Sequence, residues 1–212
     1  MGFPVYDHKT DLDNVLVTPQ IRARFLRWEP GHQSQAHSHD LGHEVFIVLG
    51  GRARFEIDGE TEDLGPGQMC VALVDQMHGI KVLGNEPMYM YLSVTPHIQP
   101  THTLWTDDGR RLPHKFASSG SYGEKVDPTE PFADLVDRFS DASAAVTEAI
   151  QSASARQSEQ LGPLKNAVGG SDSASASEAR RALWETLSPL FERVNSLASV
   201  WNDLSARSGD TH

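Results

Sequence analysis

Residues 31–51 read GHQSQAHSHDLGHEVFIVLGG, and this stretch decides where the chemistry of the chain lies. His37 and His39 are two residues apart, so on an extended strand their side chains point to the same side. Asp40-Leu41-Gly42 then supplies a turn, and Glu44 stands at the start of the apolar run that follows. The spacing therefore predicts that two imidazoles and one carboxylate converge on one point.

This set of side chains predicts a metal site. Imidazole nitrogens with a carboxylate suit Fe, Mn, Ni, Cu, Co or Zn, and they suit Ca or Mg poorly. The alternative is that both histidines are surface residues near a turn, but Glu44 and the framing glycines Gly31 and Gly51 favour ligation. His43 is adjacent to Glu44 and must point to the opposite face of the strand if Glu44 points inward. We expect one divalent transition metal per chain, with its identity left open.

Around this stretch, short apolar runs alternate with turns rich in glycine and proline. The runs are Ile21–Glu29, His43–Leu49, Arg52–Ile57, Gln68–Val74, Gly79–Leu83 and Pro87–Val94. Closely spaced short strands with such turns favour an antiparallel sandwich or barrel over a βαβ architecture. We expect an N-terminal arm over residues 1–19, a barrel over 20–98 and an irregular flap or linker over 99–128.

Beyond residue 128 the apolar residues recur at spacings of three and four, which predicts a helical hairpin over 129–208. The first helix should end near Gly162-Pro163. Ser175 and Glu178 have the capping-box spacing, so we expect the second helix to begin there. A heptad pattern needs a partner helix, which could come from this chain or from a second subunit. The apolar residues that follow this pattern are Leu183, Leu187, Leu190, Val194, Leu197, Trp201 and Leu204.

Pro189 lies inside this second helical segment. Because proline removes a backbone donor, we expect either a kink there or a restart capped by Ser188.

The barrel segment resembles the cupin superfamily. The framing residues of its first motif, G-x5-H-x-H-x4-E-x6-G, are Gly31, His37, His39, Glu44 and Gly51. Gly59 and the turn 64–67 resemble the opening of the second motif, and His78 stands where the family places a fourth ligand. The asparagine often found after this histidine is replaced by Val82. The resemblance covers roughly residues 20 to 96, and it implies a mainly β, cupin-type antiparallel barrel (jelly roll) with His78 as the fourth metal ligand.

The resemblance leaves the reaction open, because proteins with this motif include dioxygenases, isomerases, decarboxylases and lyases. We expect a metal-dependent enzyme that acts on a small organic acid or ring compound, and we favour a dioxygenase over a lyase or isomerase. The alternative from another class is a non-catalytic cupin that binds a small molecule.

The strand patterns suggest which side chains line the interior. Glu44, Phe46 and Val48 would form an inward set. Met88, Met90 and Leu92 alternate with Tyr89, Tyr91 and Ser93, so either face could be inside. If the tyrosines face inward, Tyr91 joins Glu44 as a candidate catalytic residue. Arg24 and Arg54 could pair with a substrate carboxylate if inward, although charged strand residues usually face solvent.

Composition excludes some partners and leaves others. A formal net charge of −11 disfavours nucleic acid as a partner, and no apolar stretch approaches the roughly 20 residues that cross a membrane. Cys70 is the single cysteine, and the N-terminus lacks a secretory pattern, so cytoplasm is the default location. The tendency of cupin-like barrels to pair through their sheets, and the heptad seam with Trp184 and Trp201, lead us to expect a homodimer.

Overall fold

The computed structural model describes residues 2–106, 108–116, 118 and 126–209. The chain folds into two compact units. One contains the described residues of 1–126 and of 205–212, and the other contains 127–204.

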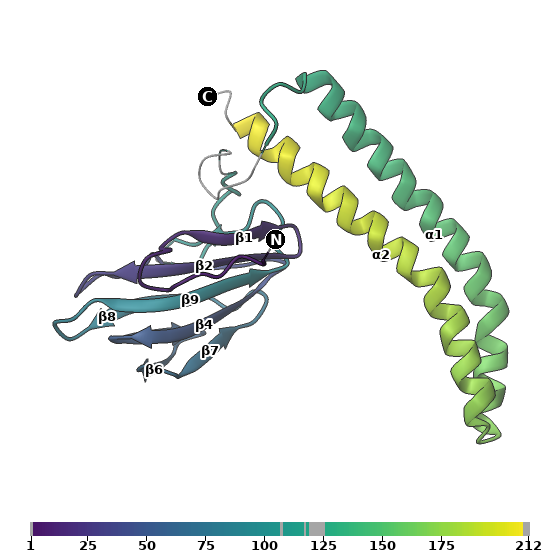
Figure 1. The fold of residues 1–212 in the computed structure, drawn as a ribbon, viewed down its shortest axis with the longest axis horizontal. Coiled ribbons are helices and arrows are strands. Elements are labelled where there is room, and N and C mark those ends of the chain that lie inside the picture. Colours follow the sequence, from purple (N-terminus) through teal and green to yellow (C-terminus); the bar gives the residue numbers. More distant parts are fainter. Residues whose placement is uncertain (1, 107, 117, 119–125, 210–212) are drawn as a thin grey trace. The chain divides into compact units, whose positions relative to one another are not determined.

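Two five-stranded antiparallel sheets make up the barrel (Figure 1). The first has the order β1 (Asn14–Thr18), β2 (Ile21–Trp28), β9 (Met88–Thr95), β4 (His43–Gly50) and β7 (Met69–Ala72). The second has the order β10 (Thr103–Leu104), β3 (His37–Ser38), β8 (His78–Leu83), β5 (Arg52–Ile57) and β6 (Glu60–Leu64). This arrangement confirms the predicted mainly β, jelly-roll-like fold.

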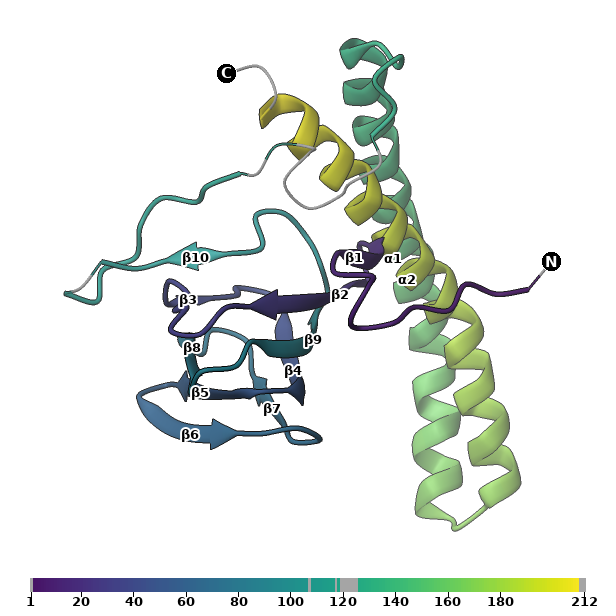
Figure 2. The ribbon, with the colours of Figure 1, turned by 60° about the vertical axis from the view of Figure 1, so that its left-hand side comes forward.

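The two sheets bury their inner faces against each other (Figure 2). Alternate residues of each strand point into this core. The first sheet contributes Phe46, Val48, Ala72, Met88, Met90, Leu92 and Val94, and the second contributes Ala53, Phe55, Leu64, Ile80 and Val82. The Met88, Met90 and Leu92 face of β9 is therefore the inner one.

Each predicted apolar run corresponds to a strand, and β3 lies where His37 was expected on a strand, but the sequence missed β1, β6 and β10. β3 and β10 have two residues each, and β6 reads ETEDL, so none of them shows an apolar alternation. β1 pairs with β2 along its length, which places part of the expected N-terminal arm in the sheet. β10 likewise lies in the expected flap, of which residues 107, 117 and 119–125 fall outside the described part.

Helix α1 (Phe132–Gly169) and helix α2 (Ser173–Gly209) run side by side as a hairpin (Figure 1). The heptad residue Trp201 packs on Phe139 of α1 at a ring distance of 5.8 Å, and Arg138 donates to Asp203 at 3.1 Å. A partner for this part of the seam therefore lies in the same chain.

Two predicted helix boundaries were wrong. α1 continues through Pro163 to Gly169, because a proline removes one backbone donor without preventing the next turns from forming their own hydrogen bonds. α2 begins at Ser173, where the Asp172 carboxylate accepts hydrogen bonds from the backbone N–H and the hydroxyl of Ser175. Asp172 thus takes the capping role expected of Ser175. α2 also passes through Pro189 without the restart considered at Ser188.

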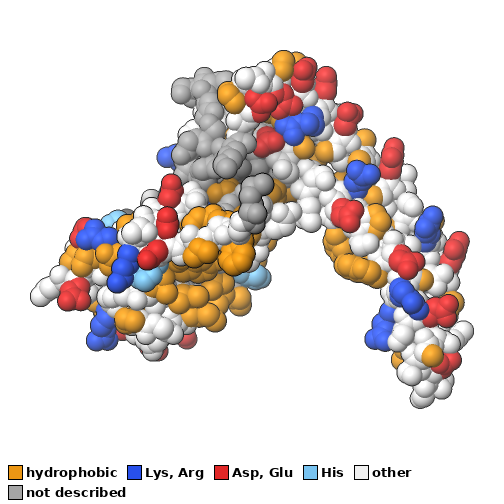
Figure 3. Space-filling model, in the orientation of Figure 1, with side chains coloured by type: hydrophobic (Ala, Val, Ile, Leu, Met, Phe, Trp, Pro, Cys, Tyr) orange, Lys and Arg blue, Asp and Glu red, His pale blue; other side chains and the backbone are white. Residues whose placement is uncertain are grey.

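Some apolar side chains lie outside the core. On β7, Met69 and Val71 are 62% and 37% exposed, while Cys70 between them faces the core. Apolar side chains also gather on the side of the barrel seen in Figure 3. No helix in the described residues is both long and apolar enough to span a bilayer.

Candidate metal centre

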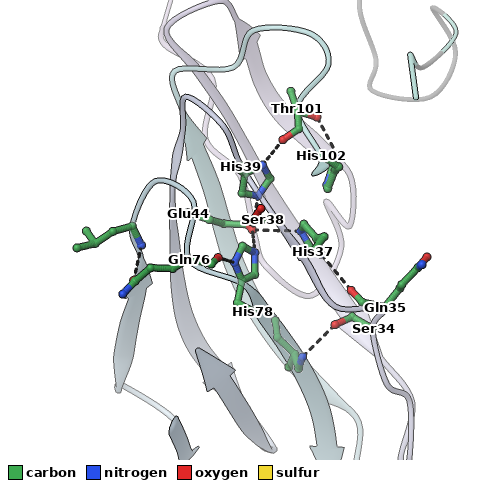
Figure 4. A network of polar contacts seen from close by, with 12 residues as sticks. Ser34, Gln35, His37, Ser38, His39, Glu44, Gln76, His78, Thr101 and His102 are labelled. Atoms are coloured by element: carbon green, nitrogen blue, oxygen red, sulfur yellow. Dashed lines mark hydrogen bonds and ion pairs between the residues drawn. The ribbon is translucent and has the colours of Figure 1, made fainter. Parts of the chain in front are cut away.

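Four side chains from both sheets meet at one end of the barrel core (Figure 4). His37 lies on β3, His39 directly follows it, and His78 opens β8 beside β3. Glu44 lies on β4, which belongs to the opposite sheet. The segment 40–42 therefore crosses between sheets, whereas the sequence suggested a turn into a neighbouring strand. The four predicted ligands are nevertheless brought together.

The donor atoms are close to one another and buried. His39 Nε2 and His78 Nε2 each lie 2.8 Å from Glu44 Oε2, and His37 Nε2 lies 3.7 Å from the same oxygen. One donor atom from each of the four residues falls within 4.8 Å of all the others. His39, Glu44 and His78 are each only 2% exposed. Such a convergence of donors is what a mononuclear site requires.

Backbone carbonyls fix the orientation of all three imidazoles. His37 Nδ1 lies 3.0 Å from the carbonyl of Gln35, and His78 Nδ1 lies 2.9 Å from that of Gln76. His39 Nδ1 bonds the carbonyl of Thr101. Because a carbonyl oxygen only accepts hydrogen bonds, each Nδ1 must carry the proton. A neutral ring with its proton on Nδ1 leaves the Nε2 lone pair available for a metal ion, as in a metal-ligating histidine.

Glu44 supplies a negative charge at this point. Its burial works against ionisation, but the interactions with His37, His39 and His78 outweigh that cost and hold its pKa well below the usual value. The site therefore contains an ionised carboxylate facing three imidazoles, and it fits a divalent cation both in charge and in donor type. His37 Nε2, buried and without a hydrogen bond to the described residues, points to the same place.

The segment after β9 adds a fourth histidine, to which the sequence analysis assigned no role. The His102 ring lies 4.6 Å from that of His37 and 5.0 Å from that of His39, and Thr101 Oγ1 lies 2.9 Å from its Nδ1. Burial lowers the pKa of His102 to about 2, and the neighbouring histidines and Arg22 contribute to the same shift. His102 is therefore neutral near pH 7 and covers the cluster without adding charge.

A cavity of about 180 Å³ adjoins three of the four donor residues, His37, Glu44 and His78. It is lined by Arg22, Arg24, Leu26, Trp28, Ser34, His37, Glu44, Phe46, His78, Ile80, Leu92 and His102. Its walls are partly apolar, and Glu44 and Phe46 point inward as expected. This interior has room for a small organic molecule beside the cluster.

Of the other candidate site residues, only Arg24 lies beside the four candidate ligands. Tyr91 lies on the outer face of β9, where its ring packs on Phe25 at 5.9 Å, so the structure does not bring it to the cluster. Arg54 pairs with Asp63 at the surface. Arg24 does line the cavity, together with Arg22, which the sequence analysis missed. The period of two along β2 was the signal that could have identified Arg22 beside Arg24.

Comparison with known proteins places the barrel in a family. Residues 24–95 match the model of the family described as "Cupin domain". "Polyketide synthase CurC" of Streptomyces cyaneus is 26% identical over 99 residues, which are 43% of this chain and 64% of that protein. The chain thus spans less than two thirds of the length of this relative.

Two solved structures are also similar. An uncharacterised protein with a double-stranded β-helix domain from Klebsiella pneumoniae has 22% identity and a TM-score of 0.42, covering 45% of this chain and 91% of its own. KdgF from Halomonas sp. has 27% identity and a TM-score of 0.37, covering 40% and 78%. The match over residues 24–95, on a two-sheet barrel with both histidines and the glutamate of the first motif, shows that this part of the chain is a cupin domain.

Proposed function

We propose that His37, His39, Glu44 and His78 hold one divalent transition metal ion, and that the protein is a metal-dependent enzyme acting on a small organic acid or ring compound. The observation that carries this proposal is the set of three imidazoles whose Nδ1 atoms are committed to backbone carbonyls. This commitment leaves three Nε2 lone pairs available for a metal ion beside Glu44.

An open coordination position distinguishes a catalytic centre from a structural one. Three of the four donor residues, His37, Glu44 and His78, line the cavity, so part of the coordination shell would face that space. When bound, the ion would act as a Lewis acid toward an oxygen of the substrate, or bring dioxygen to it. The apolar part of the wall, which includes Phe46 and Leu92, would exclude water from the organic part of the substrate.

Dioxygenase chemistry is the reaction that we propose to test first, with a lyase or isomerase second. A set of three imidazoles and one carboxylate accepts the redox-active ions Fe, Mn, Ni and Cu as well as Zn. The name of the Streptomyces relative supports polyketide-type compounds, which are rich in carbonyl oxygen, as first substrates for the assay.

Elemental analysis is the first test, on full-length protein purified without chelators or affinity metals. We expect close to one first-row transition metal ion per chain. Oxygen consumption is then measured with a panel of small keto acids and phenolic acids, and product formation is followed in parallel without oxygen. Oxygen uptake that requires substrate supports a dioxygenase, and turnover without oxygen supports a lyase or isomerase. Protein that neither retains nor takes up a transition metal contradicts the proposal.

A non-catalytic small-molecule binder is the competing function, and chelation separates the two. A binder of that kind would keep its ligand affinity after removal of the metal, whereas the enzyme would lose turnover and regain it on metal addition.

We also propose that the protein is a homodimer. Exposed Met69 and Val71 on the edge strand β7 form an apolar surface that a second barrel could cover. Light scattering coupled to gel filtration tests this, and a monomer at micromolar concentration would contradict it.

A further inference from the structure

Two arginines of β2 line the cavity beside the four candidate metal ligands. On β2 the residues Arg22, Arg24, Leu26 and Trp28 all line the cavity of about 180 Å³, because alternate residues of a strand share one face. Arg22 is 3% exposed and Arg24 is partly buried. Both also interact with other groups of the protein, as expected for charges inside a barrel.

The strand register places these arginines relative to Glu44. Arg22 is the cross-strand partner of Val94 on β9, and Val94 is in turn the partner of Glu44 on β4. Arg22 and Glu44 therefore lie on one row of the sheet with β9 between them, about 10 Å apart at their Cα atoms. Arg24 lies on the next inward row with Leu92 and Phe46. A small molecule in this cavity would therefore lie between the two guanidiniums and the candidate metal ligands.

The described residues that line the cavity carry more positive than negative charge. Among its described lining residues Glu44 is the only carboxylate, and it is committed to three imidazoles. Two guanidiniums and a bound divalent ion would leave the cavity strongly positive inside a protein whose net charge is −11. Such a cavity concentrates anions and repels cations. The apolar side chains Leu26, Ile80 and Leu92 on the same walls suit the carbon skeleton of an organic anion.

We propose that Arg22 and Arg24 form the anion-binding subsite of this cavity, and that the substrate is a small organic carboxylate held by them with another of its oxygens toward His37, Glu44 and His78. This assignment rests on the proposed function, since it names the substrate class of the same site. A guanidinium offers paired N–H donors in one plane, which match the two oxygens of a carboxylate. The carboxylate would thus be oriented before the rest of the molecule meets the metal.

The wild-type protein alone provides the first test. Isothermal titration of the full-length, metal-loaded protein with succinate and with succinamide compares an anion with a neutral molecule of the same size. We expect succinate to bind roughly tenfold more tightly or better, because hydrogen bonds between charged groups are the stronger ones. Equal affinities would overturn the proposal. Inorganic phosphate is the third probe, and tighter binding of phosphate than of succinate would overturn the assignment to a carboxylate.

Variants then locate the subsite. Arg24→Gln should weaken succinate binding roughly tenfold or more and leave succinamide unchanged, and Arg24→Lys should give an intermediate affinity. Arg27→Gln is the matched control, because Arg27 lies on the same strand but is exposed and bonds Tyr89 at 3.1 Å. Succinate affinity that is the same in Arg24→Gln and wild type would overturn the proposal. Thermal unfolding identifies a variant that fails to fold, in which case Arg24→Lys carries the comparison.

Metal content, measured on every variant, separates this inference from the proposed function. Succinate binding that depends on Arg24 in a protein that takes up no metal would leave the subsite standing and overturn the metal centre. A metal-loaded protein whose succinate affinity is the same with and without Arg24 would overturn the subsite and leave the metal centre standing.

Discussion

His37 and His78 are direct cross-strand partners on β3 and β8, so the first and second histidine motifs meet through a backbone pairing. This relationship matters because the sequence around His78 departs from the usual pattern of the second motif. The pairing, together with the 2.8 Å separation between His78 Nε2 and Glu44 Oε2, brings this residue into the cluster despite that departure.

Removal of one imidazole should abolish stable metal retention. In His39→Ala we expect the bound transition metal to fall to less than roughly a tenth of the wild-type content after gel filtration, because the three remaining ligands release the ion more readily than four do. Elemental analysis after gel filtration measures this. His43→Ala is the control, since His43 is exposed and its Nδ1 accepts a hydrogen bond from Val74 at the surface. Equal metal content in the two variants would contradict the assignment.

Replacement of Glu44 tests the anionic ligand. Glu44→Gln keeps the size of the side chain but removes the charge, so we expect metal affinity to fall about 10–100-fold, the scale on which perturbed metal sites usually lose binding. Competition with a chromophoric chelator gives the dissociation constant. Glu56→Gln, at an exposed position of β5, should leave the constant unchanged. An affinity in Glu44→Gln that matches the wild type would exclude Glu44 as a ligand.

The two framing glycines of the motif should differ in their tolerance of alanine. Gly31 has a φ of +77° but open space around a would-be Cβ, so Gly31→Ala should cost about 1–2 kcal/mol from backbone strain alone. At Gly51, with a φ of +70°, a Cβ would lie 2.5 Å from the carbonyl oxygen of Pro87 and 2.9 Å from Cα of Met88.

Because those neighbours are backbone atoms that cannot rotate away, Gly51→Ala should cost at least about 1 kcal/mol more than Gly31→Ala in the free energy of unfolding. Urea denaturation of both variants measures the difference. Equal losses of stability would show that the hairpin after β4 can shift to accept the methyl group.

The single thiol should be unreactive in the folded protein. Burial raises the pKa of Cys70 to about 12, and the negative charge of Glu44 acts in the same direction. Since the thiolate is the nucleophile, alkylation by iodoacetamide at pH 8 should be at least about 100-fold slower than in the urea-unfolded chain. Mass spectrometry over time gives both rates. Rapid labelling of folded protein would mean that β7 opens readily or that the thiol is accessible.

The barrel could be predicted from sequence because its strands are apolar on one face and separated by glycine and proline turns. The cluster could be predicted because three of its members share one short stretch, 37–44. The sequence could not show that Glu44 and His37 belong to opposite sheets, since the pairing partners of β4 and β3 are distant in the chain. Nor could it show which face of β9 is inside, because methionine and tyrosine both occur in cores.

The two helix boundaries were predicted wrongly because local sequence signals were misleading. Gly162-Pro163 has the composition of a stop signal, yet helical geometry continues on both sides of it. The acidic cap at Asp172 was missed because Ser175 and Glu178 offered a second capping pattern three residues later.

The carbonyl of Thr101, which bonds His39 Nδ1, belongs to the segment that follows the last long strand of the barrel. A protein shortened after residue 98 would keep all four donor side chains but lose the acceptor that stops one imidazole from rotating. If the proposed metal centre is correct, a shortened chain should bind the ion more weakly unless the stretch through Leu104 is retained.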